Sequence, residues 1–178
     1  DGVSIDACIT LRAKSKSLEF RTKVDWRASE RFLKVDIPMA IQADRAQYEC
    51  QYGMVERPIQ KNTRSDEAKY ESCTHRFVRV ADAGYAAAVV NASTYGSDVS
   101  PIHRNTASGP VRGTMIRLSL LSSPLYPDPN TDKGVHEFAW NVVADASMPA
   151  VLDEANRLNA AVLPAMPAFD PLAQLNPV

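Results

Sequence analysis

The densest mixture of chemically useful side chains lies between residues 52 and 77, where arginine, asparagine and carboxylate groups are interleaved with aromatic rings. Amide, carboxylate and guanidinium groups hydrogen-bond to hydroxyls, and aromatic rings stack on apolar C–H faces. This combination favours a sugar-binding surface. The candidate substrate-binding residues, which include one tyrosine further along the chain, are Arg57, Asn62, Asp66, Tyr70 and Tyr95. A long loop held by its own polar side chains is an alternative of equal weight.

Hydrolytic chemistry is not predicted within the chain. Glycoside hydrolysis needs two carboxylates at a set separation in a cleft. The closest carboxylate pairs are Asp66 with Glu67 and Asp128 with Asp132. Both pairs fall in loop-like sequence, where solvation explains them. A GxSxG turn and a glycine-rich phosphate loop are also missing from the sequence. We therefore predict no catalytic residue in this chain.

Metal binding and disulfide bonding are not predicted either. A zinc site needs three or four convergent ligands, and the histidines here are widely spaced. The three histidines are His75, His103 and His136. The three cysteines are Cys8, Cys50 and Cys73. An odd number without a CxxC motif favours a reducing compartment, so we predict a cytoplasmic location. We expect the cysteines to be small buried apolar residues, and we expect no metal ligand and no cofactor in this chain.

The composition is that of a globular protein, and it excludes two classes of partner. The 178 residues carry 20 basic and 21 acidic side chains, which gives a formal net charge of −1. A domain that binds nucleic acid usually carries a basic excess, so nucleic acid is not predicted as a partner. No run of about 18 apolar residues is present, so no membrane partner is predicted. The first residue is not methionine and no signal peptide is visible, so we expect processing or a longer parent chain.

Apolar and polar residues alternate with a period of two over most of the chain, which is typical of half-buried strands. Strands are predicted near residues 3–11, 18–26, 33–37, 48–52, 70–80, 85–91, 116–120 and 136–142. Turn signals separate them at intervals of about ten residues, and helical crossovers are lacking. The fold class is therefore predicted to be all-β, an antiparallel β-sandwich. The alternation starts within the first residues, so we expect the sandwich to continue on both sides of the chain.

One helix is predicted, over residues 147–162. Ser147 is a suitable N-cap, Pro149 suits the first turn, and Asp153 and Glu154 favour the positive end of the helix dipole. Four prolines then interrupt residues 164–178. We predict one domain over residues 1–163 and a proline-rich connector over residues 164–178.

The order of motifs resembles the C-terminal part of the glycoside hydrolase family 38 α-mannosidases, mainly the cytosolic and bacterial branch. The matching positions are Tyr52-Gly53, Arg57-Pro58, Asn62-Thr63, Asp66, Ala68, Tyr70-Glu71, His75-Arg76-Phe77, Tyr95-Gly96, Ser119-Leu120-Leu121, Pro127-Asp128, Gly134, His136 and Phe138. The likeness covers residues 18–160. It departs from the family pattern at Ile59-Gln60 and Ser122, and residues 98–113 are expected to form a longer loop than is usual.

The resemblance implies a C-terminal β-sandwich similar to part of the mutarotase-like supersandwich. It also implies that zinc and the catalytic carboxylates lie in the N-terminal catalytic domain of a parent enzyme, which hydrolyses terminal α-D-mannosides with retention. The implied partners are that catalytic domain, mannosides or oligosaccharides, and, as an open alternative, further copies of the same chain. The chain alone is expected to be inactive and to support the substrate cleft.

Two other hypotheses stay open from the sequence. One is a non-catalytic carbohydrate-binding β-sandwich module that uses the five candidate residues as contacts. The other is an assembly element that buries an apolar face against another domain or subunit, in which case the isolated chain exposes a large apolar patch.

Overall fold

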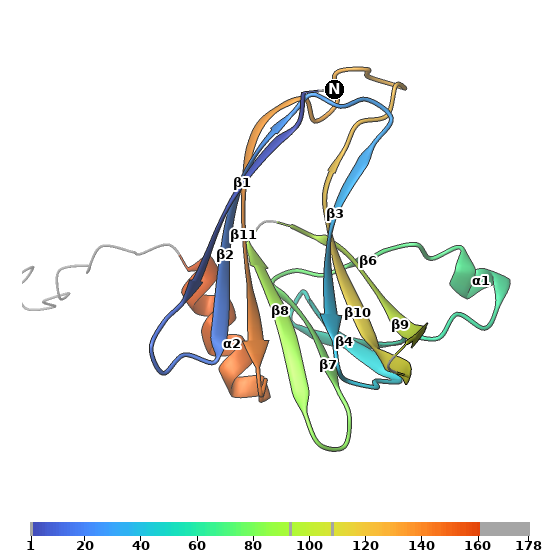
Figure 1. The fold of residues 1–178 in the computed structure, drawn as a ribbon, viewed down its shortest axis with the longest axis vertical. Coiled ribbons are helices and arrows are strands. Elements are labelled where there is room, and N and C mark those ends of the chain that lie inside the picture. The colour runs from blue at the N-terminus through green and yellow to red at the C-terminus, as the bar shows by residue number, and fades with distance from the viewer. Residues whose placement is uncertain (1, 93, 108, 161–178) are drawn as a thin grey trace, which may run out of the picture.

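The chain folds as two antiparallel β-sheets that pack face to face (Figure 1). A computed structural model describes residues 2–92, 94–107 and 109–160. The seven-stranded sheet has the order β1-β2-β11-β8-β7-β4-β5, and the four-stranded sheet has the order β3-β10-β9-β6. The strands are β1 Ser4–Leu11, β2 Ser17–Trp26, β3 Phe32–Met39, β4 Arg45–Cys50, β5 Gly53–Pro58, β6 Ser72–Cys73, β7 Phe77–Ala81, β8 Ala86–Ala92, β9 Gly96–Thr106, β10 Gly109–Ser122 and β11 Gly134–Ala144. The predicted all-β sandwich is confirmed.

The main core lies between the two sheets. Val78, Val89 and Trp140 from the seven-stranded sheet meet Ile116 and Leu118 from the four-stranded sheet, and all five are buried. They occupy alternate positions of their strands, as the period of two requires. Where a strand alternates in this way, as β2 does, its inward and outward faces can be assigned directly from the sequence.

Three segments differ from the strands that the sequence predicts. Strand β5, at Gly53–Pro58, was not predicted. The single strand expected over residues 70–80 is wrong, because β6 pairs in one sheet and β7 in the other. The chain crosses between the layers at Thr74, whose hydroxyl donates to the Phe77 carbonyl oxygen at 2.5 Å. The long loop expected over residues 98–113 is also wrong. This segment belongs to β9 and β10, which pair from Gly109–Thr106 to Leu118–Ser97.

Helix α2 spans Met148–Asn159 and covers the face of β7, β8 and β11 that points away from the four-stranded sheet (Figure 1). Ser147 is the N-cap residue, but its side chain makes no capping hydrogen bond. The expected role of Asp153 and Glu154 at the helix start is wrong, because the first turn contains no acidic residue. A second, short helix, α1 Arg64–Glu67, was not predicted. The predicted connector over residues 164–178 lies outside the described residues.

Glu154 joins α2 to the sheet through a cluster of polar contacts. Its carboxylate accepts hydrogen bonds from Ser17 Oγ at 2.6 Å, from Asn141 Nδ2 at 2.5 Å and from Arg157 Nη2 at 2.7 Å. The Arg157 hydrogen bond is the main cause that lowers the pKa of Glu154 to about 2. The ionised carboxylate is therefore the form that the folded chain stabilises.

This contact predicts a loss of stability in acid. A carboxylate with a lowered pKa stabilises the fold above its unfolded value and loses that effect as the pH falls through its folded value. Between about pH 4.5 and pH 2, Glu154 should lose on the order of 1 kcal/mol, given its partly solvated site. Urea unfolding of the unsubstituted 178-residue chain and of its Glu154→Gln variant, at pH 6 and at pH 3, measures this loss of unfolding free energy. The variant should show the smaller decrease on acidification, and equal decreases would contradict the assignment.

The cysteines differ from expectation in their exposure. Cys8 and Cys73 are exposed and Cys50 is half-buried, and all three are free. The expectation of three buried cysteines is therefore wrong. Cys8 lies on β1, where every residue is exposed, and Cys73 lies on β6 at the end of the smaller sheet.

In the part of the chain that the structure describes, neither helix has the length and apolar character needed to cross a membrane.

Candidate functional site

A polar pocket of about 220 Å³ opens where the edge strands of the two sheets meet. Arg57 lies on β5, which ends the seven-stranded sheet, and Ser72 lies on β6, which ends the smaller sheet. The connection between these strands carries α1 and projects from the sandwich (Figure 1). It supplies Asp66 and Tyr70 to the pocket wall. We call this site the edge pocket.

The edge pocket brings together three of the five residues that the sequence predicts. Arg57, Asp66 and Tyr70 line it, and the Tyr70 ring is exposed. Asn62 and Tyr95 are also within the described part of the chain, but they do not line this pocket. The Tyr95 ring instead packs edge-on against the His75 ring, with 5.8 Å between the ring centroids. Both residues line a separate hollow of about 380 Å³.

Short-range contacts fix the polar groups of the pocket. Thr63 Oγ1 donates to the Asp66 carboxylate at 2.7 Å and accepts from the Asp66 backbone N–H at 3.1 Å. The Thr63 hydrogen bond lowers the pKa of Asp66, and Lys69 Nζ adds an ion pair at 3.7 Å. On the inner side, burial raises the pKa of Tyr48 to about 12. The pocket therefore offers an anionic carboxylate, a guanidinium group and a protonated phenol.

Beside the edge pocket, the outer face of the smaller sheet carries an ion-paired cluster that sequence reasoning missed. Lys34 Nζ contacts Asp98 Oδ2 at 2.8 Å and Glu71 Oε1 at 2.7 Å. Arg117 Nη2 contacts Asp98 Oδ1 at 2.6 Å, and Ser119 donates to Glu71. The carboxylate of Asp98 is thus held between two cations although its side chain is only 7% exposed. Glu71 and Asp98 also line the edge pocket, so the cluster fixes one of its walls.

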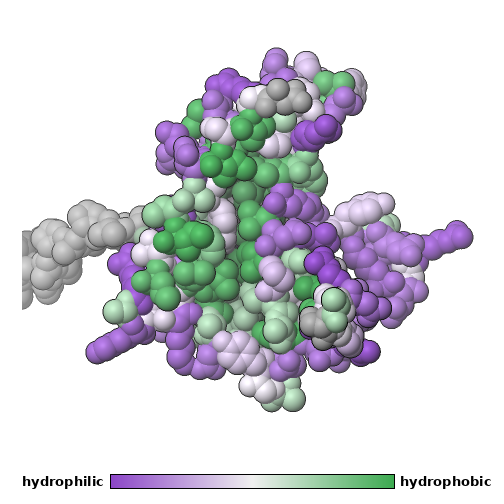
Figure 2. Space-filling model, in the orientation of Figure 1, coloured by the Kyte–Doolittle hydropathy of each residue, from purple (hydrophilic) through white to green (hydrophobic). Residues whose placement is uncertain are grey.

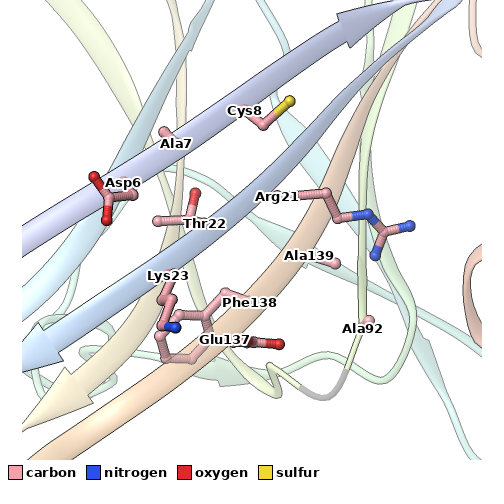
Figure 3. A pocket seen from close by; sticks show the side chains of 10 residues that line it. All are labelled: Asp6, Ala7, Cys8, Arg21, Thr22, Lys23, Ala92, Glu137, Phe138 and Ala139. Carbon is pink, nitrogen blue, oxygen red and sulfur yellow. The ribbon is translucent and has the colours of Figure 1, made fainter.

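A wider hollow of about 610 Å³ lies on the seven-stranded sheet (Figure 3). Its residues Arg21 and Lys23 share a face of β2 with Glu19, which contacts Arg157 of α2. Figure 3 shows side chains of neighbouring strands in rows across it, with Cys8 on β1, Arg21 on β2 and Ala139 on β11. Asp6, Lys23 and Glu137 form a parallel row of alternating charge. Its lining includes no histidine. The hollow is shallow, and charged side chains of the sheet line it. Its lining residues do not place a nucleophile in contact with a general base.

The residues that the structure describes do not form a metal site. No group of three or more histidine, cysteine, aspartate or glutamate side chains among them converges in a way that could hold an ion. The described residues thus form a two-layer antiparallel β-sandwich with open pockets on its surface.

Comparison with known proteins identifies the family. Residues 1–130 match the Glycosyl hydrolases family 38 C-terminal domain. The chain is 34% identical over 157 residues to Alpha-mannosidase 2C1 of Mus musculus and 34% identical over 141 residues to Alpha-mannosidase of Saccharomyces cerevisiae. These alignments cover 86% and 79% of this chain. The chain belongs to glycoside hydrolase family 38 and represents part of its C-terminal region.

A solved structure supports the same fold. The crystal structure of an alpha-mannosidase from Enterococcus faecalis V583 superposes on 85% of this chain with a TM-score of 0.67 and 18% sequence identity. The chain covers 17% of that protein, and it covers 14% of the mouse relative and 12% of the yeast relative. The family match and the two named relatives confirm the resemblance to family 38. The chain corresponds to about a seventh of the length of its mouse relative.

Proposed function

We propose that this chain is a supporting β-sandwich of an α-mannosidase, and that its parent polypeptide hydrolyses terminal α-D-mannosides. The observation that carries the proposal is the family match over residues 1–130. Two relatives at 34% identity, both α-mannosidases by name, support it. In this proposal the sandwich packs against the N-terminal catalytic part of the parent and helps to shape the sugar cleft.

The proposal places the reacting groups outside these residues. Retaining hydrolysis needs a carboxylate nucleophile and a second carboxylate as acid and base, about 5–5.5 Å apart. The family resemblance adds a zinc ion, which would orient the sugar and polarise its oxygens. The free cysteines support a reducing, cytoplasmic location.

The full-length polypeptide provides the test. It should hydrolyse p-nitrophenyl α-D-mannoside and leave the matched β-D-mannoside intact. The two substrates carry the p-nitrophenyl leaving group on opposite faces of the sugar ring, so one active site cannot place both for attack. Proton NMR of the first product formed should show the α-anomer, as retention requires. Hydrolysis of neither substrate, or of the β-anomer alone, would overturn the proposed activity.

The edge pocket favours a second candidate function, direct binding of sugar by this chain. Arg57, Asp66 and Tyr70 offer a cation, an anion and an exposed ring within one pocket. Titration of the chain with mannose and mannobiose tests this, and saturable binding at millimolar concentration or tighter would support it. Tyr70→Ala should then abolish the signal. Tyr52→Ala is the matched control, because Tyr52 is also exposed but lines the separate hollow beside Tyr95.

A further inference from the structure

Strand β1 is the free edge of the larger sheet. It pairs with β2 on one side over eight consecutive residues, from Ser4–Asp25 to Leu11–Leu18, and it stands at one end of the strand order. All eight residues of Ser4–Leu11 are exposed. The pairing contains no bulge, so the strand presents a regular row of backbone groups on its open side.

One face of β1 is apolar although nothing in the described chain covers it. Ile5 and Ile9 stand opposite Val24 and Phe20 of β2, so they and Leu11 point toward the side of the smaller sheet. Ile5 is 51% exposed, Ile9 59% and Leu11 68%. These exposed fractions mean that the smaller sheet leaves the three side chains open, although its residues Leu33 and Leu121 pack on the neighbouring strand β2. Figure 2 shows apolar side chains gathered on this side of the molecule.

The edge lacks the devices that keep exposed strands from pairing. Native edge strands carry lysine or proline, are very short, or contain bulges. The eight residues of β1 contain neither lysine nor proline, and Asp6 is their single charge. Asp6 also points to the opposite face from Ile5 and Ile9. A strand of this kind is typical of a sheet interior rather than of a free edge.

We propose that β1 is covered by a further strand of the same parent polypeptide, which pairs with it in antiparallel fashion and packs alternate apolar side chains beside Ile5, Ile9 and Leu11. Every strand pairing in the two described sheets is antiparallel. Strands that follow one another in sequence are usually neighbours in a sheet, which favours a strand that lies close to β1 along the parent chain. The chain spans only 14% of its mouse relative, so a longer parent has residues to supply this strand.

A second copy of this chain is the rival occupant. Two β1 edges could pair around a two-fold axis, since an antiparallel pair of identical strands is self-complementary. Pairing within one polypeptide is favoured because the tether gives the covering strand a high effective concentration.

The inference depends on the proposed function only in requiring a longer parent chain. Its failure would leave the hydrolysis of mannosides by that parent unaffected.

Hydrogen exchange of the full-length polypeptide tests the proposal on the unmodified protein. If β1 is covered, the peptide that contains Ser4–Leu11 should exchange as slowly as the peptide from the central strand β8. If the edge is open, about half of its amides point to solvent and should exchange at the rate of loops. Fast exchange of these amides would overturn the proposal. Protection that disappears on dilution to a monomer would assign the edge to a second copy and would also overturn it.

A pair of substitutions separates coverage of the apolar face from pairing of the edge. Ile9→Lys places a charge on the face that the proposal buries, and Thr10→Lys places the same charge on the opposite face of the same strand. In the full-length polypeptide, Ile9→Lys should lower the melting temperature by several degrees or prevent soluble expression. Thr10→Lys should leave it nearly unchanged. Equal and small effects of both substitutions would contradict the buried position of Ile9.

Discussion

The purified 178-residue chain is expected to hydrolyse p-nitrophenyl α-D-mannoside no faster than buffer. The full-length polypeptide should hydrolyse it many orders of magnitude faster than buffer. Enzymes typically accelerate such reactions by at least about 10⁶-fold. That acceleration needs a nucleophile and an acid held together in a cleft. The edge pocket is lined by three carboxylates, of which Glu71 and Asp98 are held in ion pairs with Lys34. Thr63 and Lys69 stabilise the anionic form of the third, Asp66. Such a group is a poor proton donor at neutral pH.

The control for this result is a chain in which Asp66 is replaced by Asn. The background rate should be identical for the two chains, because no step of the reaction is assigned to Asp66. Hydrolysis that copurifies with the chain and is lost in Asp66→Asn would contradict the placement of catalysis outside these residues. The same measurement would then identify the edge pocket as an active site.

Replacement of Phe77 by Ala should cause the largest loss of stability among single substitutions in the apolar layer between α2 and the seven-stranded sheet. Phe77 is fully buried, and it packs with Val90 and Val143 of the sheet and with Val151 and Ala155 of α2. Removal of a buried phenylalanine ring costs about 3–5 kcal/mol, because transfer energy is lost and a cavity remains. Urea unfolding followed by far-ultraviolet circular dichroism measures the change, and α2 should lose its docking site in the same transition.

Phe32→Ala is the matched control, since it removes the same ring from an exposed position. Phe32 is 51% exposed, and its ring lies 4.7 Å from Lys34 Nζ. An exposed cation–π contact of this kind contributes about 0.5–1 kcal/mol. The Phe32 variant should therefore lose far less stability than the Phe77 variant. Comparable losses would show that α2 and the sheet do not form the packed layer described here.

The strands that could be predicted are those in which apolar and polar residues alternate, because one face of the strand is buried and the other is exposed. Alternation in β2 and β11 is visible because one face of each meets the core. Strand β9 was missed because Ser97, Asp98, Ser100, Pro101 and His103 show no apolar alternation. Its strand geometry comes from pairing with β10, which is a contact between distant residues. Helix α1 carried a local signal, the Thr63–Asp66 capping pair, which was not used in the prediction.

The candidate site was partly predictable for a similar reason. Arg57, Asp66 and Tyr70 share one pocket because the chain returns from β5 to β6 within a short segment. Tyr95 lies between β8 and β9 in the chain, and the fold places it beside His75 instead. The Lys34, Asp98 and Arg117 cluster depends on the register of three strands. That register cannot be derived from alternation alone, because each strand pattern fits several pairings.

Covalent trapping on the full-length polypeptide tests most directly whether this chain supports catalysis without performing it. A fluorinated mannosyl fluoride that forms a slowly hydrolysed glycosyl-enzyme would mark the nucleophile of a retaining enzyme. After proteolysis and mass spectrometry, the sugar should be found on a carboxylate outside residues 1–178. Labelling of any aspartate or glutamate within residues 1–178 would contradict the account.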